Sequence, residues 1–362
     1  MKIAIYTIAL NERQFVDAWY ESAKEADYLL IADTGSTDGT VQHAKSLGIN
    51  VLPIYVKPWR FDVARNASLA SLPTDIDYCI ALDMDEVLLP GWRECLEKAL
   101  KNNWTRPRYQ YTWNWNEDGT PGLQYGGDKI HTRWGYRWKH PVHEVLVRYG
   151  DSPELQGWVD LEIHHHADNT KPRSQYLPLL AQAVQEDLSD DRNAFYYARE
   201  LYFYGRYEEA SKEFKRHLEL PRAQWPPERA ASMRYLGKIE TDKAEYWFRQ
   251  AIEQAPGRRE PWLDLAKYYY SKQDWKNCLE CSIETLSIKE KPLEYLCEAD
   301  AWGESPYDFA AISCYRLGKY SEALEYGKKA VEINPNDERL QKNLTFYEIG
   351  GKTISSSDPS SS

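Results

Sequence analysis

Apolar and polar positions follow two different rhythms along this chain. Among the first 90 residues, apolar runs of strand length occur at residues 2–10, 28–32 and 51–56 and from residue 78, with helix-like stretches between them. Strands that alternate with helices predict a parallel sheet covered by helices, which is the α/β class. From residue 173 onward the pattern is helical. The chain is therefore expected to contain an α/β part followed by an all-helical part.

The helical part repeats itself. Residues 205–210 and 318–323 are near copies, and small residues recur 34, 34 and 45 residues apart. These small residues are Ala210, Ala244, Cys278 and Ala323. The last spacing is 34 plus an insertion of 11 residues around residues 289–306. A 34-residue period of paired helices is the signature of the tetratricopeptide repeat (TPR), which forms curved solenoids. We predict about four such hairpins over residues 171–345 and a disordered tail over 346–362.

Three carboxylates close the fourth apolar run. Asp83 and Asp85 are separated by one residue, and Glu86 follows. Strand periodicity places the first two on one side of the backbone, about 7 Å apart. Such carboxylates repel each other unless a cation lies among them, and Mg²⁺ or Mn²⁺ takes these ligands together with substrate phosphates. Because open α/β sheets bind ligands at the carboxyl ends of their strands, the pattern indicates a metal site, with an acidic loop as the alternative.

The loop at residues 33–40 crowds Gly, Ser, Thr and Asp into a tight turn with exposed backbone N–H groups. Together with residues 5–12, 64–67 and 82–86, this loop resembles the nucleotide-diphosphate-sugar domain of family 2 glycosyltransferases. The resemblance covers about the first 90 residues. It implies an α/β GT-A (Rossmann-like) domain over residues 1–170, before the all-α TPR-like repeats. It also implies metal-dependent transfer, with inversion, from a nucleotide-diphosphate sugar such as a UDP-sugar.

The resemblance assigns residues to the nucleotide. It implies that the base and ribose are bordered by Thr7, Ala9 and Asn11. Asp33 would accept a hydrogen bond from the base, most simply from a uracil N–H. Arg65 would reach the base or the diphosphate, because a guanidinium binds phosphate through two parallel hydrogen bonds. A surface salt bridge is the alternative for Arg65.

For the metal, Mn²⁺ or Mg²⁺, the resemblance implies Asp85 as a ligand. Asp83 would bind directly, through water, or to the ribose. GT-A enzymes often add one late histidine, and three consecutive histidines follow a strand-like stretch here. Alternation along a strand separates His165 from its two neighbours, so we expect His164 or His166 at the metal. Structural hydrogen bonding of all three is the alternative.

Residues 104–149 are rich in aromatic and basic side chains. Tyr109, Tyr111, Trp113 and Trp115 recur with period two, so one strand face would carry four rings. Such rings stack on sugars or bases, whereas a strand face that packs into the core is the alternative. The interleaved basic side chains leave acceptor binding open.

Inversion requires a general base on the acceptor side of the sugar. In similar glycosyltransferases a His-Glu pair lies at this place, so Glu144 is the first candidate base and His143 the second. Many family members carry Glu-Asp there, which leaves the identity of the base open. A structural salt bridge from Glu144 to Arg133, Arg137 or Arg148 is the alternative.

Composition and charge restrict the binding partners and the cellular compartment that we expect. The formal charge of −11 argues against wholesale binding to nucleic acids or acidic membranes. No apolar run approaches the length of a transmembrane helix. The six cysteines are scattered over 362 residues, which fits a reducing cytosol better than a disulfide framework. We therefore expect a cytoplasmic protein.

Three functions compete. The first is a sugar-nucleotide glycosyltransferase whose acceptor is a protein, a glycan, a lipid or a modified DNA base, with repeats that bind the acceptor or a protein partner. The second is a TPR scaffold with a catalytically silent GT-A domain. The third is a nucleotidyltransferase. The four acidic and basic residues of the motifs, Asp33, Arg65, Asp83 and Asp85, favour the first. The missing Gly-rich loop with Arg and Lys near the start argues against the third.

Overall fold

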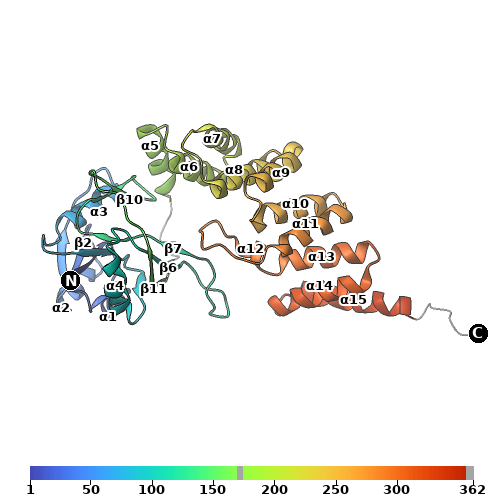
Figure 1. The fold of residues 1–362 in the computed structure, drawn as a ribbon, viewed down its shortest axis with the longest axis horizontal. Coiled ribbons are helices and arrows are strands. Elements are labelled where there is room, and N and C mark those ends of the chain that lie inside the picture. The colour runs from blue at the N-terminus through green and yellow to red at the C-terminus, as the bar shows by residue number, and fades with distance from the viewer. Residues whose placement is uncertain (169–173, 356–362) are drawn as a thin grey trace, which may run out of the picture. The chain divides into compact units, whose positions relative to one another are not determined.

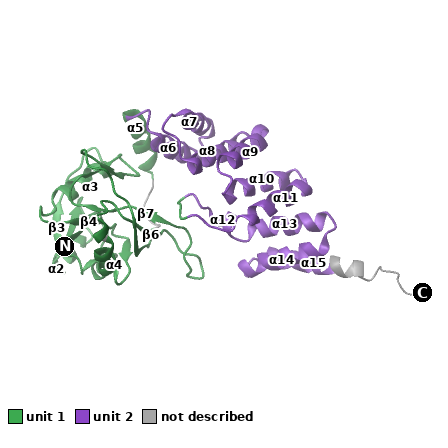
Figure 2. Cartoon of the chain, viewed as in Figure 1, with its two compact units in different colours: residues 1–186, 293–295 green, residues 187–292, 296–362 purple. Residues whose placement is uncertain are grey.

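A computed structural model describes residues 1–168 and 174–355 of the chain (Figure 1). The chain forms two compact units (Figure 2). Unit 1 contains residues 1–186 and 293–295, and unit 2 contains residues 187–292 and those from 296 onward. The predicted division at residue 170 lies outside the described residues, as do residues 356–362 of the predicted tail.

A five-stranded sheet forms the centre of unit 1. Its strands, in spatial order, are β3 (Asn50–Pro53), β2 (Tyr28–Asp33), β1 (Ile3–Ala9), β4 (Tyr78–Ala81) and β8 (Ile130–Thr132). The first four are parallel, and β8 runs antiparallel to β4. The strand order reverses beside β1, since the chain adds β2 on one side and β4 on the other. The prediction of an α/β domain is confirmed, and this reversal is the place where such sheets bind ligands.

Alternation along β1 explains why both faces of this sheet are covered. Ile3 and Ile5 pack on one face with Trp19, and Ala4 and Tyr6 pack on the other. The connecting helices are α1 (Val16–Ala23), α2 (Thr40–Ser46) and α3 (Phe61–Ala70), as Figure 1 shows. A strand buried on both faces reads as the continuous apolar run seen in the sequence.

A second sheet holds the aromatic segment and the histidines. Its strands, in order, are β5 (Glu86–Leu88), β11 (Trp158–His165), β6 (Arg108–Thr112) and β7 (Gln124–Gly127). The remaining elements of unit 1 are α4 (Trp92–Ala99), the 3₁₀ turn η1 (Leu100–Asn102), the hairpin β9 (Tyr136–Lys139) with β10 (Val145–Arg148), and α5 (Tyr176–Glu186). Tyr109 and Tyr111 are buried in the core. Trp113 and Trp115 lie beyond the end of β6, so the period-two strand ends earlier than the four rings suggested.

Unit 2 consists of helical hairpins. They are α6 (Asp191–Phe203) with α7 (Tyr207–Glu219), α8 (Pro226–Ile239) with α9 (Ala244–Gln254), α10 (Arg259–Ser271) with α11 (Trp275–Ser287), and α13 (Ser305–Arg316) with α14 (Tyr320–Ile333). The 3₁₀ turn η2 (Thr241–Lys243) precedes α9, α12 (Ala299–Trp302) lies in the insertion, and α15 (Glu338–Ser355) follows the last hairpin. The predicted helical repeats are confirmed. The last helix runs from Glu338 to Ser355 and so extends into the predicted tail, which we expected to begin at residue 346.

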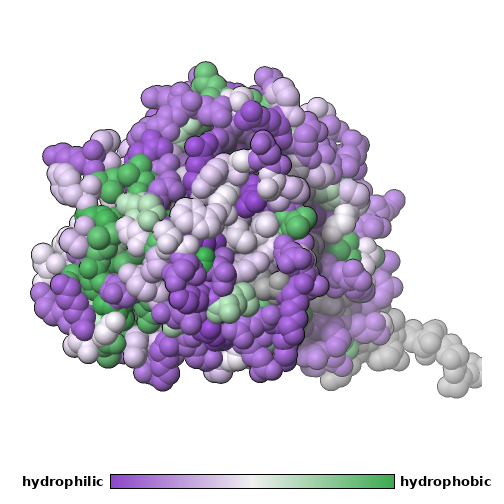
Figure 3. Space-filling model, turned by 60° about the vertical axis from the view of Figure 1, so that its left-hand side comes forward, coloured by the Kyte–Doolittle hydropathy of each residue, from purple (hydrophilic) through white to green (hydrophobic). Residues whose placement is uncertain are grey.

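The small residues that set the 34-residue period are buried between paired helices. Ala210, Cys278 and Ala323 are fully buried and Ala244 nearly so. None of the six cysteines forms a disulfide. Among the described residues, no helix combines the length and the apolar character needed to cross a bilayer. The face drawn in Figure 3 is largely hydrophilic, with hydrophobic residues gathered in separate patches.

A close approach between α8 and α9 gives the first testable expectation. A Cβ atom added at Gly237 would lie 2.5 Å from the ring of Phe248. Alanine favours a helix over glycine by about 1 kcal/mol, whereas overpacking costs about 1–3 kcal/mol. Gly237→Ala should therefore lower the free energy of unfolding by about 1 kcal/mol in denaturant titrations. Gly257→Ala, in the turn between α9 and α10 where the added atom meets nothing within 4 Å, is the control without a close contact. Equal stability of both variants would contradict this packing.

A buried histidine in β8 makes unit 1 sensitive to acid. Nδ1 of His131 donates to the carbonyl of Thr132 (2.8 Å), so Nε2 of the neutral ring accepts from the Tyr6 hydroxyl (2.9 Å). Nε1 of Trp138 donates to the same hydroxyl (2.8 Å). Burial lowers the pKa of His131 to about 4.

The unfolded chain gains a proton on this histidine near pH 6.5, whereas the folded chain does not until about pH 4. Its contribution to stability is therefore present above pH 6.5 and is lost as the pH falls from there toward 4. The stability difference between wild type and His131→Asn should shrink by about 2 kcal/mol between pH 7 and pH 4.5 in denaturant titrations. Comparison with the variant cancels the other titrating groups. A difference independent of pH would contradict the assignment.

Candidate functional site

Several of the residues assigned to the nucleotide and metal lie at the carboxyl ends of neighbouring strands. Asp33 is the last residue of β2, and its register partner on β1 is Ala9. Asp83 and Asp85 follow β4, and the backbone N–H of Leu82 donates to the carbonyl of Tyr6 on β1 (3.1 Å). These segments therefore meet at the edge where the strand order reverses.

The loops after β1 and β2 are tied together. Asn11, with a positive φ of 57°, accepts through Oδ1 from the backbone N–H of Thr37 (2.8 Å). Its own N–H donates to Oγ of Ser36 (2.8 Å). The backbone N–H and hydroxyl of Thr34 both donate to the carbonyl of Ala9 (2.9 and 3.0 Å). Asn11 thus shapes this rim of the site.

Two predicted nucleotide residues are largely buried. Asp33 accepts from the backbone N–H groups of Gly35 (3.0 Å) and Ser36 (3.1 Å), so its carboxylate also holds the turn. The side chain of Thr7 lies in the core, and its hydroxyl donates to the carbonyl of Ile8 (3.2 Å). Contacts of these residues with a nucleotide remain predictions.

Arg65 lies at the centre of a buried charge cluster. It comes from α3, and Nη2 forms an ion pair with Oδ1 of Asp83 (2.8 Å). Nε donates to Oε1 of Glu144, and the guanidinium lies 5.0 Å from the centre of the Trp138 ring. Burial opposes the charge of Arg65, but Asp83 and Glu144 outweigh it and raise its pKa. Because Arg65 is only 6% exposed, a surface salt bridge is excluded.

Sequence reasoning missed Lys129, which completes this cluster. Nζ of Lys129 donates to Oδ2 of Asp83 (2.6 Å) and to Oε1 of Glu86 (2.8 Å). Glu86 is buried and also accepts from the hydroxyl of Tyr111 (2.6 Å). In the sequence Lys129 is only one of the basic residues interleaved with the aromatic side chains of residues 104–149, and nothing links it to Asp83. We call Arg65, Asp83, Glu86, Lys129 and Glu144 the charge cluster.

Both oxygens of Asp83 are paired with cations of the charge cluster. Burial would raise the pKa of the Asp83 carboxyl, but the charges of Arg65 and Lys129 outweigh burial and hold it well below its ordinary value. A divalent ion bound directly to Asp83 would lie beside these two positive charges. The geometry therefore favours a role in positioning or in ribose contact over direct ligation.

Asp85 faces His165 and neither of its neighbours. Oδ2 of Asp85 lies 3.4 Å from Nε2 of His165, which comes from the last position of β11. Nδ1 of His165 donates to the carbonyl of Trp113 (2.8 Å), and the two rings stack with centroids 4.4 Å apart. Burial would lower the pKa of His165, but Asp85 and the Trp113 carbonyl raise it.

The other two histidines point elsewhere. Nε2 of His164 is hydrogen-bonded to Oε1 of Glu162 (2.9 Å), on the face of β11 opposite to His165. His166 is exposed, and its ring is parallel to that of Trp115 at 6.1 Å. Alternation separates the three residues as expected, but the side that meets Asp85 carries His165. The assignment of His164 or His166 to the metal is untested, and this geometry favours His165.

The Asp85–His165 pair fits a divalent cation. Since Nδ1 of His165 gives its hydrogen to a carbonyl, Nε2 directs either a lone pair or a second proton at the carboxylate. A metal-bound histidine has this arrangement, with its other nitrogen held by a backbone carbonyl. Among the described residues, no group of three or more His, Cys, Asp or Glu side chains could hold a metal. Mg²⁺-type sites commonly use one or two protein ligands, with water and substrate phosphates completing the shell.

The two candidate bases differ in their surroundings. Oε1 of Glu144 is held by Arg65, whereas no hydrogen bond to Oε2 is found among the described residues. The salt bridge of Glu144 is therefore to Arg65, and not to Arg133, Arg137 or Arg148, which the structural alternative had named. His143, which has a positive φ of 50°, lies with its ring 5.6 Å from that of Tyr176 on α5.

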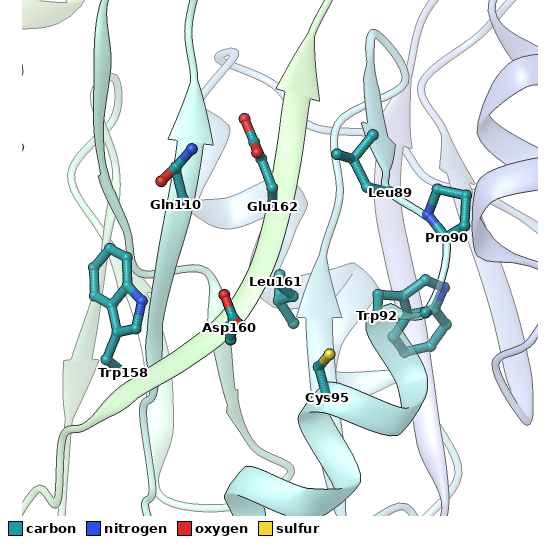
Figure 4. A pocket seen from close by; sticks show the side chains of 10 residues that line it. Leu89, Pro90, Trp92, Cys95, Gln110, Trp158, Asp160, Leu161 and Glu162 are labelled. Atoms are coloured by element: carbon teal, nitrogen blue, oxygen red, sulfur yellow. The ribbon is translucent and has the colours of Figure 1, made fainter.

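A shallow cavity of about 220 Å³ lies elsewhere in unit 1, between α4 and the N-terminal part of β11 (Figure 4). Gln110, Trp158, Asp160 and Glu162 line one side of it, and Leu89, Pro90 and Cys95 the other. None of the predicted site residues lines this cavity.

Comparison with known proteins gives two family matches. The family model described as glycosyl transferase family 2 matches residues 4–141, and that of the tetratricopeptide repeat matches residues 306–337.

Three solved structures show the level of similarity. The C-terminal part of a TPR repeat-containing protein from Cytophaga hutchinsonii is 13% identical, with a TM-score of 0.40 over 50% of this chain and 67% of that one. MamA is 12% identical, with a TM-score of 0.37 over 45% and 82%. The APC/C hetero-tetramer Cut9-Hcn1 is 11% identical, with a TM-score of 0.39 over 49% of this chain. This chain spans only about a third (34%) of that last structure's chain. Similarity at this level carries no functional information.

Proposed function

We propose that this chain, which carries a glycosyl transferase family 2 domain at residues 4–141 followed by tetratricopeptide repeats, transfers a sugar from a nucleotide-diphosphate sugar to an acceptor. The observation that supports this most is the charge cluster, whose Asp83 lies two residues before Asp85 at the strand-order reversal of a parallel sheet. We take the donor to be a UDP-sugar, since Asp33 at this edge suits a uracil N–H.

One N–H group of Arg65 is suited to a hydrogen bond with the nucleotide sugar. Its Nη1 is buried and has no hydrogen-bond partner among the described residues. A buried N–H without a partner costs about 1–3 kcal/mol. A phosphate or base oxygen of the nucleotide would satisfy it, while Asp83 and Glu144 keep the guanidinium in place.

Asp85 and His165 would hold Mn²⁺ or Mg²⁺ beside the diphosphate, with Asp83 as a neighbour. When bound, such an ion stabilises the negative charge that develops on the leaving nucleoside diphosphate. The charge cluster sets two cations against three carboxylates, and Asp85 adds a further negative charge, so a divalent ion also improves the local charge balance.

Glu144 is the proposed general base for transfer with inversion. Arg65 fixes its Oε1, which leaves Oε2 to accept the proton of the acceptor's attacking group. His143 is the second candidate. We further propose that the repeats bind the acceptor or a protein partner, and that the protein works in the cytoplasm, where its six free cysteines would remain reduced.

A donor panel tests the proposal against the two competing functions. The protein is incubated with Mn²⁺ and a set of nucleotide sugars, and the products are separated by chromatography. We expect nucleoside diphosphate from at least one donor. Pyrophosphate would indicate a nucleotidyltransferase, and no product from any donor would favour a scaffold with a silent domain.

A further inference from the structure

The insertion that interrupts the repeats folds back onto them. It lies between α11 and α13 and contains α12, which packs against α10 and α13. Among the described hairpins, the first helices of successive repeats contact one another and form one row: α6, α8, α10 and α13. The preceding connection, residues 255–258, shows that four residues suffice to join two hairpins.

Glu298 of the insertion is held by two parallel hydrogen bonds. Nη1 of Arg234 on α8 donates to Oε1 (2.8 Å), and Nη2 donates to Oε2 (2.8 Å). Arg234 is only 6% exposed and also forms an ion pair with Asp264 on α10 (2.6 Å). Nζ of Lys238 lies 3.4 Å from the same Asp264 carboxylate. This paired geometry is the arrangement by which arginine recognises a carboxylate.

A second carboxylate two residues further on is also received by a cation. Asp300 forms an ion pair with Lys267 of α10. Glu298 and Asp300 therefore contact basic side chains of α8 and α10, one each. The protein has a formal charge of −11, yet this part of the helix row pairs two cations, Arg234 and Lys267, with the carboxylates of the insertion.

Two residues of α10 also contact the backbone of the insertion and the ring of Trp302. Oε1 of Glu260 accepts from the backbone N–H of Glu298 (3.1 Å) and from Nε1 of Trp302 (3.1 Å). Arg259 lies 4.1 Å from the centre of the Trp302 ring and donates to the carbonyl of Ala301 (3.4 Å). The segment is thus contacted through side chains, a backbone donor and a backbone acceptor, as a bound peptide is.

Resting on the proposed role of the repeats in binding the acceptor or a partner, we propose that the row formed by α8 and α10 is a binding site for acidic peptide segments, and that residues 298–302 are its built-in occupant. The partner would carry two carboxylates two residues apart, as Glu298 and Asp300 are. The side chains of Glu298 and Asp300 are 44% and 45% exposed. Because ion pairs of such exposed carboxylates add little net stability, a link that served only to stabilise the repeats would gain little from them. The tethered occupant acts at a millimolar-range effective concentration, so an external ligand binds when it outcompetes that segment.

The test removes the two charges of the built-in occupant and supplies the same chemistry from outside. A labelled synthetic peptide of residues 296–303 is titrated into the full-length double variant Glu298→Gln/Asp300→Asn and followed by fluorescence anisotropy. We expect binding about tenfold or more tighter than to wild type. The control Glu280→Gln/Glu284→Gln removes the same charge from exposed positions on α11 and should behave as wild type. A peptide with Gln and Asn at the two acidic positions should not bind.

Equal binding of the acidic and neutral peptides to the double variant would overturn the proposal. If that variant does not fold, a second measurement on the wild-type protein tests the proposal. In wild type, hydrogen exchange of residues 296–303 should accelerate when unlabelled acidic peptide is added in excess and should not respond to the neutral peptide. Unchanged exchange at a peptide concentration above the effective concentration of the tether would also overturn it.

Discussion

Asp85→Asn should abolish the release of nucleoside diphosphate from the nucleotide sugar, with a loss of about 10²-fold or more in turnover. Asn keeps the size of the side chain but removes the charge that would hold a divalent ion with His165. The fold should be unaffected, because the Asp85 side chain contacts His165 at the edge of the sheet and is not part of the core. Steady-state release of nucleoside diphosphate in Mn²⁺ measures the effect, and the melting temperature checks the fold.

Substituting each of the three histidines in turn tests which of them binds the metal. His165→Ala should reduce turnover to a similar extent, whereas His164→Ala and His166→Ala should cost much less. Asp151→Asn, at an exposed position, is the matched control for the change of charge. Full turnover of Asp85→Asn, or a larger loss in His164→Ala than in His165→Ala, would refute this assignment.

Glu144→Gln should lower transfer by about 10²–10⁴-fold and leave binding of the donor nearly unchanged. Glutamine retains the shape and an oxygen that can accept from Nε of Arg65, but it does not take up a proton at neutral pH. Arg65→Lys should act differently. It removes the planar group that pairs with Asp83 and Glu144, so donor binding should weaken as well as turnover. Calorimetric titration of the donor and initial rates separate the two effects.

Two outcomes would show that Glu144 is not the general base. If Glu144→Gln retains most of its turnover, Glu144 serves only to hold Arg65, and His143 becomes the candidate. If the product retains the anomeric configuration of the donor, transfer does not need a base of this kind.

The parts that the sequence predicts well depend on local patterns. The buried runs of β1, β2 and β4 are apolar on both faces, so their positions and the carboxylates at their ends can be read directly from the sequence. The repeats are equally predictable from the sequence, because paired helices that pack closely need a small residue at the same place in each repeat. The motifs single out Arg65 and Asp83, and the structure brings them together.

The remaining features depend on contacts between distant segments. Alternation shows that His165 points away from His164, but which face meets Asp85 depends on β5 and β6, which flank β11. Lys129 reaches Asp83 only because β8 pairs with β4. Likewise, Glu144 meets Arg65 because α3 packs against β9, a contact with no local signature in the sequence.

Calorimetric titration with the nucleoside diphosphate that the donor panel releases tests the central claim most directly. In Mn²⁺ we predict one binding site per chain, with binding weakened about tenfold or more by a chelator and to a similar extent by Asp85→Asn. Binding of equal strength with Mn²⁺, with chelator and in the variant would contradict a metal-assisted nucleotide site at the carboxyl edge of β1 and β4.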